Sequence, residues 1–283
     1  MDMGVHPPSR GALTRRTLLR LATGVTAGLV VGEAAYGGLY ERHHLGLTRA
    51  DLRLPALPPA LDGLRIGLIT DTHYSAYTSL PFITRAVEMV QREAPDLIVL
   101  GGDYVTRQQK EYIPDAATPF AALRAPSGVF GVVGNHDDAV GIPRALRAAG
   151  VTLLRDARTR LDIRGEVVDL LGVDYWTRKM SERTSFVRGR APFSILLAHN
   201  PTRFWEAAAL KLPLVLSGHT HGGQVSLPIV GPVAAQRFPV AEGVRVEGDT
   251  TLFVSRGVGT VVLPCRLHCP PEVAVLTLRS TRA

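Results

Sequence analysis

The chain has 283 residues, 46% of them hydrophobic and 20% charged, which is enough apolar sequence for one sizeable core. Its net charge of +7 is spread along the chain without long Lys/Arg runs or interleaved aromatic residues, so no nucleic-acid partner is expected. The only cysteines are Cys265 and Cys269, too few for a disulfide-stapled fold, and we expect both thiols to be free.

Residues 1–40 resemble an export signal of the twin-arginine type. Paired Arg15 and Arg16 precede an apolar stretch rich in Ala, Gly and Val. Leu21–Tyr40 carries one charge, Glu33, and is just long enough to span a bilayer at about 20 residues. We therefore expect a twin-arginine-type signal or retained membrane anchor that engages the twin-arginine export machinery. The chain would then be exported, and membrane-associated or extracytoplasmic. The alternative is a chance arginine pair before an ordinary anchor.

Apolar runs and helical periodicity alternate along the rest of the chain. A Pro-rich connector is expected over 41–60, followed by one α/β domain over 61–283. The first helix of that domain is predicted to begin after Ser79 and to end at Pro95. Further helices are predicted over 142–149 and 204–210, and strands over 64–70, 96–100, 129–133, 151–154, 160–163, 167–173, 194–198, 214–216, 252–255 and 273–278.

Five short motifs of His, Asp and Asn directly follow predicted strands. They are Asp71-Thr72-His73, Gly102-Asp103, Gly134-Asn135-His136-Asp137, His199 and Gly218-His219-Thr220-His221. A lone His after a strand is usually a hydrogen-bonded loop residue, so each motif is weak by itself. Ligands in open α/β sheets gather at the carboxyl ends of strands, so all five can converge. Imidazole with carboxylate suits Zn, Mn or Fe, and the lack of Cys ligands argues against a closed structural zinc site.

The order of these motifs resembles that of the calcineurin-like metallophosphoesterase family, from Leu61 to the carboxyl terminus. The stretches that look most like its bacterial membrane-associated, exported branch are Leu196–Pro201, Gly218–Gln224, Ser255–Gly259 and Cys269–Glu272. The resemblance implies an α/β fold in which a two-sheet β-sandwich is flanked by helices, in four αββα layers. The metal site would lie at one edge of this sandwich.

The resemblance also implies two divalent metal ions, whose identity among Mn, Zn and Fe stays open. The implied ligands are Asp71, His73 and His221 for the first ion, Asn135, His199 and His219 for the second, and Asp103 as a bridge between both. His136 would stabilise the transition state and protonate the leaving oxygen, unless its role is purely structural. Asp137 and Asp138 are candidates to orient it. The second Asp that many relatives carry after Gly-Asp is missing here, which leaves the orienting partner of His136 open. Arg256 is expected to bind the substrate phosphate, the alternative being an ordinary surface arginine.

The function implied is dimetal-dependent hydrolysis of a phosphodiester, phosphomonoester or pyrophosphate bond. The expected location favours a small-molecule or lipid phosphoester that is membrane-associated or extracytoplasmic. The alternatives are a catalytically silent, metal-dependent binding or scaffold protein of the same fold, and a metal-dependent amide hydrolase.

Overall fold

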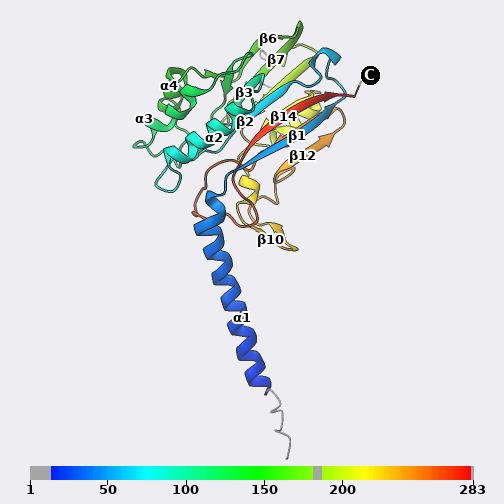
Figure 1. The fold of residues 1–283 in the computed structure, drawn as a ribbon. Coiled ribbons are helices and arrows are strands. Elements are labelled where there is room, and N and C mark those ends of the chain that lie inside the picture. The colour runs from blue at the N-terminus through cyan, green and yellow to red at the C-terminus, as the bar shows by residue number, and fades with distance from the viewer. Residues whose placement is uncertain (1–13, 181–186, 282–283) are drawn as a thin grey trace, which may run out of the picture.

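The computed structural model describes residues 14–180 and 187–281, so residues 1–13 of the predicted signal segment lie outside the described part. Two six-stranded sheets pack face to face, and helices cover their outer faces (Figure 1). The predicted four-layer α/β sandwich is therefore confirmed.

The first sheet has the order β1-β14-β2-β3-β4-β5. Strands β2, β3, β4 and β5 are parallel neighbours, whereas β14 runs antiparallel to β2 and parallel to β1. The helices of this half are α2 and α4, with the short α3. The bounds are β1 Gly46–Leu54, β2 Arg65–Ile69, β3 Leu97–Leu100, β4 Val129–Gly131, β5 Thr152–Leu153, β14 Glu272–Ser280, α2 Leu80–Arg92, α3 Ile113–Ala116 and α4 Gly141–Ala148.

The second sheet has the order β12-β13-β9-β8-β7-β6. Its four central strands are parallel, and β12 and β6 pair antiparallel at the two edges. Helix α6 packs on its outer face. The bounds are β6 Ala157–Ile163, β7 Glu166–Val173, β8 Phe193–Ala198, β9 Leu214–Ser217, β12 Gly243–Glu247, β13 Thr250–Val254 and α6 Arg203–Ala209.

The core forms three layers because the central strands are buried on both faces. In β8, Ile195 and Leu197 join the cluster between the two sheets, whereas Leu196 and Ala198 join the cluster under α6. A strand buried on both faces appears in the sequence as a continuous apolar run, which is why these strands are predictable. The face of α2 predicted from its periodicity is confirmed: its buried residues are Ile83, Ala86, Val87 and Val90.

The predicted connector over 41–60 is wrong in its central part. Gly46–Leu54 forms β1, which pairs with β14 along its whole length. Leu52 and Leu54 are buried in the core between the sheets, while Arg53 is exposed. This alternation is typical of an edge strand with one buried face. The folded domain therefore includes β1 and begins before residue 61.

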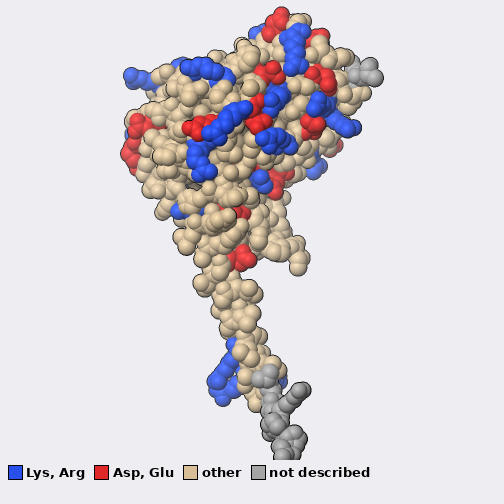
Figure 2. Space-filling view, in the orientation of Figure 1, with Lys and Arg blue, Asp and Glu red and all other residues tan. Residues whose placement is uncertain are grey.

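Helix α1 (Arg15–Ala35) projects from the domain, and none of its residues is buried (Figure 1). Within the helical stretch Arg15–His43, an 18-residue window has a mean hydropathy of 1.4, so the segment is long and apolar enough to cross a membrane. Figure 2 shows a surface almost free of charged side chains between the basic amino-terminal end of α1 and the domain.

The end of α1 is fixed to the domain by hydrogen bonds. Arg266 donates its backbone N–H to the Gly37 carbonyl at 3.1 Å. The buried Glu41 carboxylate accepts from the backbone N–H groups of His268 at 2.9 Å and Cys269 at 2.5 Å. The short hairpin of β10 (Ser226–Leu227) and β11 (Gly231–Pro232) projects from the same end of the domain (Figure 1).

Candidate metal centre

The predicted ligands meet at one edge of the sandwich, where the parallel strands of both sheets end. Strands β2, β3 and β4 lead into the loops with Asp71, Asp103 and Asn135, and β8 and β9 lead into those with His199 and His219. The structure brings six side chains together as two groups of three. Within each group, the ligand atoms all lie within 4.8 Å of one another. These groups are Asp71, His73 and His221, and Asp103, His199 and His219.

In the first group, two imidazoles and a carboxylate converge. His73 Nε2 lies 3.1 Å from His221 Nε2, and His221 Nε2 lies 3.5 Å from Asp71 Oδ1. Asp71 is oriented by the Thr70 hydroxyl at 2.5 Å and by the backbone N–H of His219. Neutral imidazole and carboxylate donors with fixed orientation are the ligands that a divalent transition metal requires.

In the second group, Asp103 lies between both sets of imidazoles. Its Oδ2 is 3.2 Å from His199 Nε2 and 3.5 Å from His73 Nε2 of the first group. His199 Nε2 is in turn 3.1 Å from His219 Nδ1. His199 donates its Nδ1–H to the Gly101 carbonyl at 2.8 Å, which leaves Nε2 as the ligand atom of the neutral ring.

Asn135 offers the donor that the second group lacks. Its side-chain Oδ1 is buried and has no hydrogen-bond partner among the described residues. A buried carbonyl oxygen without a partner is costly and requires an explanation, for which a bound cation is one of the standard ones. The residues present therefore fit a pair of divalent ions.

The backbone at this edge is strained. The five residues Asp71, His73, Asp103, His219 and His221 all have positive φ, between 44° and 73°. Such left-handed conformations cost a non-glycine residue on the order of 1–3 kcal/mol each and cluster at functional sites. The left-handed turns allow residues close in sequence, such as Asp71 and His73, to point to the same place.

Two glycines allow the loops to approach the carboxylates. A Cβ at Gly134 would lie 2.0 Å from Asp103 Oδ1, and a Cβ at Gly218 would lie 2.1 Å from Asp71 Oδ2. Any larger residue at either position would displace a predicted metal ligand. The glycines of these two motifs are thus explained by close packing against the metal site.

Burial sets the protonation of the imidazoles. Burial lowers the pKa of His73 and of His219 to about 3, so both rings are neutral at pH 7. Burial also acts to lower the pKa of His199, but the Asp103 carboxylate outweighs it and raises that pKa to about 9. A cation placed between them would displace the proton that His199 and Asp103 share, so metal affinity is expected to fall as the pH falls.

His136 is oriented by backbone groups, not by the candidate aspartates. Its Nδ1 accepts the N–H of Arg107 at 2.9 Å, so the neutral ring carries its proton on Nε2. Asp137 instead accepts from backbone N–H groups of Asp103, Tyr104 and Gly134, at 2.9, 2.7 and 2.8 Å. Asp138 accepts from the first N–H groups of α4. Both candidate aspartates thus bind backbone N–H groups, and the hydrogen bond that orients the His136 ring comes from Arg107.

The Arg256 side chain, which we expected to bind the substrate phosphate, is paired with two carboxylates. Its Nη2 lies 2.6 Å from Glu272 Oε2, and its Nε lies 3.3 Å from Glu242. Two carboxylates thus already neutralise this guanidinium.

The arginine whose side chain contacts the centre is Arg266, which is fully buried. Its Nη2 lies 3.4 Å from His221 Nδ1 and donates hydrogen bonds to backbone carbonyls such as that of Gly257. Nothing in its sequence context distinguishes it from a surface arginine.

A cavity of about 520 Å³ opens beside the centre. Predicted site residues, including Asn135 and His136, line one wall, and Arg237 supplies a cation stacked on the Phe238 ring at 5.0 Å. The remaining wall is largely apolar, with Val225, Val233, Ala234, Phe238, Val261, Val262 and Leu263. Arg237 and this apolar wall were not predicted from the sequence, because they lie in loops without periodicity.

Comparison with known proteins agrees with this geometry. The sequence profile described as calcineurin-like phosphoesterase matches residues 64–223. The uncharacterized metallophosphoesterase YkuE of Bacillus subtilis is 30% identical over 285 residues, covering 95% of this chain and 99% of that protein. Phosphodiesterase YaeI of Escherichia coli is 32% identical over 225 residues, covering 76% and 82%.

A third relative carries a more specific name. UDP-2,3-diacylglucosamine pyrophosphatase LpxG of Chlamydia muridarum is 26% identical over 296 residues, covering 83% of this chain and 90% of that protein. The family profile covers more than half of the chain, and two of these relatives align at 30% identity or more over most of their length. The chain therefore belongs to the calcineurin-like phosphoesterase family and is a metal-dependent phosphoester hydrolase.

Proposed function

We propose that this enzyme uses two divalent ions to hydrolyse a lipid phosphoester that is membrane-associated or extracytoplasmic. The observation that carries this proposal is the cavity, whose lining combines predicted metal ligands with apolar side chains. A phosphoester group would lie against the ligands, and an acyl chain would lie against the apolar wall. Each buried CH₂ group contributes roughly 0.8 kcal/mol to binding.

The proposed ligand set follows the two groups, with Asp103 shared between them because its Oδ2 lies within 3.5 Å of one imidazole from each. When bound, such a pair of ions polarises the phosphoryl group and lowers the pKa of the attacking water. Asn135 completes the second set through its unpartnered oxygen. The left-handed loops hold these donors in place before any substrate arrives.

His136 is the proposed general acid. It lines the cavity, and the N–H of Arg107 at its Nδ1 keeps the proton on Nε2. The carbonyl of His136 also accepts the N–H of Gln108 at 2.8 Å, so the loop after Val105 fixes both the backbone and the ring. The Nε2–H group is then free to donate to the leaving oxygen of the substrate.

The proposed location rests on α1. The paired Arg15 and Arg16 stand at the first turn of a helix that is apolar and unburied along its length. Hydrolysis of a lipid is consistent with the diacylated substrate in the name of the LpxG relative. The hairpin tip at Ile229 and the cavity residues Val262 and Leu263 are also exposed, so apolar surface continues from the cavity to the outside.

The first prediction concerns the substrate class. Manganese-loaded full-length protein should hydrolyse phosphatidylglycerol with a kcat/KM at least about tenfold above that for its deacylated headgroup diester, because only the lipid reaches the apolar wall. Leu263→Asp should remove this preference and leave the hydrolysis of bis-p-nitrophenyl phosphate unchanged. Equal rates for both diesters would contradict the lipid proposal. Failure to cleave any phosphoester would favour the scaffold alternative, and cleavage of p-nitroanilides alone would favour an amidase.

The second prediction concerns the general acid. His136→Gln should retain the metal content of the wild type and lose about 10²–10⁴ in kcat, because the amide cannot transfer a proton. The matched control is His44→Gln, a change at an exposed histidine next to Tyr40. Elemental analysis and turnover are measured on both variants. Loss of metal from His136→Gln would show that His136 is a ligand.

The third prediction separates the shared ligand from an unshared one. Asp103→Asn should lower the occupancy of both ions, because its carboxylate lies between the two groups. Asp71→Asn should lower mainly one, because Asp71 belongs to the first group alone. Metal per chain is measured by elemental analysis after dialysis. Equal losses in the two variants would contradict the bridging role.

The fourth prediction concerns export. Replacing both Arg15 and Arg16 by Lys should prevent the domain from reaching the outer side of the membrane, because twin-arginine signals are read through the arginine pair. Arg20→Lys serves as the control for charge in the same helix. Digestion by protease added outside spheroplasts reports the location. Normal export of the double variant would indicate an ordinary membrane anchor.

A further inference from the structure

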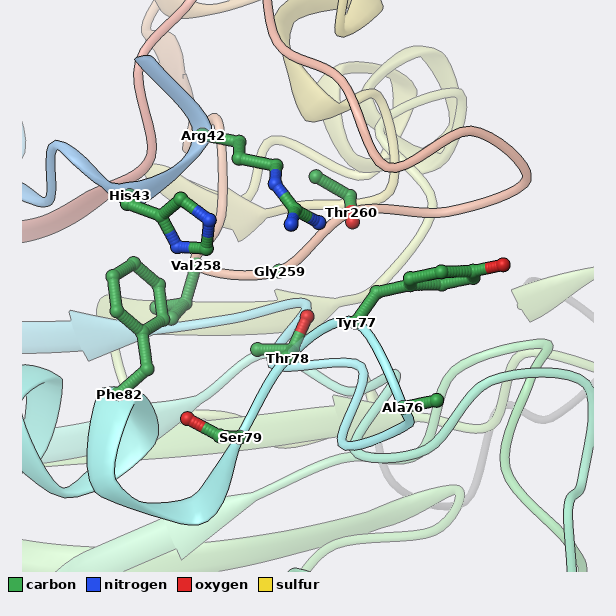
Figure 3. A pocket seen from close by; sticks show the side chains of 10 residues that line it. All are labelled: Arg42, His43, Ala76, Tyr77, Thr78, Ser79, Phe82, Val258, Gly259 and Thr260. Carbon is green, nitrogen blue, oxygen red and sulfur yellow. The ribbon is translucent and has the colours of Figure 1, made fainter. Parts of the chain in front are cut away.

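A second, smaller cavity lies where α1 enters the domain. It has a volume of about 230 Å³, and its lining includes Arg42, Tyr77, Thr78 and Thr260. Figure 3 shows the Arg42 side chain extending across this cavity with its guanidinium directed toward Thr260. No Asp or Glu lines it.

The guanidinium of Arg42 lacks a counterion. Its Nε and Nη1 atoms are buried and have no hydrogen-bond partner, and within residues 14–180 and 187–281 no carboxylate forms an ion pair with it. The neighbouring Glu41 is committed to the backbone of His268 and Cys269. Buried N–H groups without a partner are costly, even on a half-buried side chain such as that of Arg42, and a guanidinium fork fits the oxygens of a phosphate group.

The other lining groups suit the same ligand. Figure 3 shows the hydroxyl groups of Thr78 and Thr260 on the side of the cavity that the Arg42 guanidinium occupies, and the Phe82 ring lies at the left, below His43. A cavity of this size accommodates a phosphate ester and is smaller than a typical site for a drug-sized ligand. The chemistry of the lining thus points to a small oxyanion with an adjoining apolar part.

The place of the cavity indicates where that anion comes from. Arg42 lies in the short helical turn Glu41–His43. The turn Tyr36–Tyr40 connects it to α1, and Tyr36, Leu39 and Tyr40 of that turn are exposed. Exposed Tyr side chains next to an apolar helix are typical of the interface between a membrane and water. The phosphate groups of a bilayer lie at that level.

We propose that the Arg42 cavity binds the phosphate group of an anionic phospholipid, at a site separate from the metal centre. That the anion is a lipid phosphate rests on the proposed membrane location. That the cavity binds an anion at all rests on Arg42 alone. A neighbouring cavity shares Tyr77 and Thr260 with this one, and it shares Val262 and Leu263 with the metal-side cavity. The bound lipid would therefore lie along the same surface as the substrate entrance.

The test uses full-length metal-loaded protein in detergent micelles and a phosphonate analogue of phosphatidic acid, whose C–P bond resists hydrolysis. Binding is followed by Tm, so the result does not depend on turnover. The lipid should raise the Tm of the wild type by about 5 °C at saturating concentration. Arg42→Gln should lose the part of this shift that comes from the Arg42 cavity. Any phosphonate at the metal centre is common to all variants and cancels in the comparison.

The matched control is Arg85→Gln. Arg85 is exposed, lies with its guanidinium 6.0 Å from the Phe82 ring and does not line the cavity, so its variant should keep the full shift. Equal shifts in Arg42→Gln and Arg85→Gln would overturn the proposal. An equal shift with dioleoylglycerol, which lacks the phosphate, would also overturn it. An Arg42-dependent shift produced by inorganic phosphate and not by the lipid would overturn the membrane source.

A second variant covers the case in which Arg42→Gln does not fold. Thr260→Asp places a carboxylate toward the Arg42 guanidinium, as the orientation in Figure 3 indicates. This variant should have a higher Tm than the wild type without lipid, because the guanidinium gains an internal partner, and it should lose the lipid-dependent shift. A lower Tm together with a full shift would show that Arg42 is not the anion-binding group.

Discussion

The metal centre depends on one buried carboxylate that is not a predicted ligand. Asp137 accepts backbone N–H groups from the loop after β3, at Asp103 and Tyr104, and from the loop after β4, at Gly134. Because all three bonds end on one buried carboxylate, Asp137 holds the two loops together. The positions of Asp103 and Asn135 relative to each other follow from this contact.

The strained loops are stable because neighbouring loops hold them. Asp71 donates its backbone N–H to the Gly102 carbonyl at 2.9 Å, and His73 donates to the Asp103 carbonyl at 3.0 Å. These bonds continue the pairing of β2 with β3 past the ends of the strands. The left-handed residues are therefore fixed by the sheet, and the free energy stored in them comes from folding and not from metal binding.

The sequence was sufficient for the features that depend on local pattern. The α2 face and the strands with two buried faces follow from periodicity, and the convergence of His, Asp and Asn follows from the common edge of parallel strands. Long-range packing was not visible. Strand β1 was missed because charged residues such as Arg49 and Arg53 interrupt its apolar pattern, and the contact of His136 with Arg107 uses a backbone donor that any residue type provides. Arg256 and Arg266 are only ten residues apart, and tertiary packing alone decides which one lies beside the centre.

The attachment of α1 to the domain has a consequence for how the enzyme meets its substrate. The packing of Gly37 against Arg266 and the bonds from Glu41 leave no flexible tether between helix and domain. If α1 lies in a bilayer, as proposed, these contacts would hold the catalytic opening at a constant height above the lipid surface. The search for substrate would then be lateral diffusion in two dimensions, and the distance of a phosphoester group from the surface would decide which molecules are cleaved.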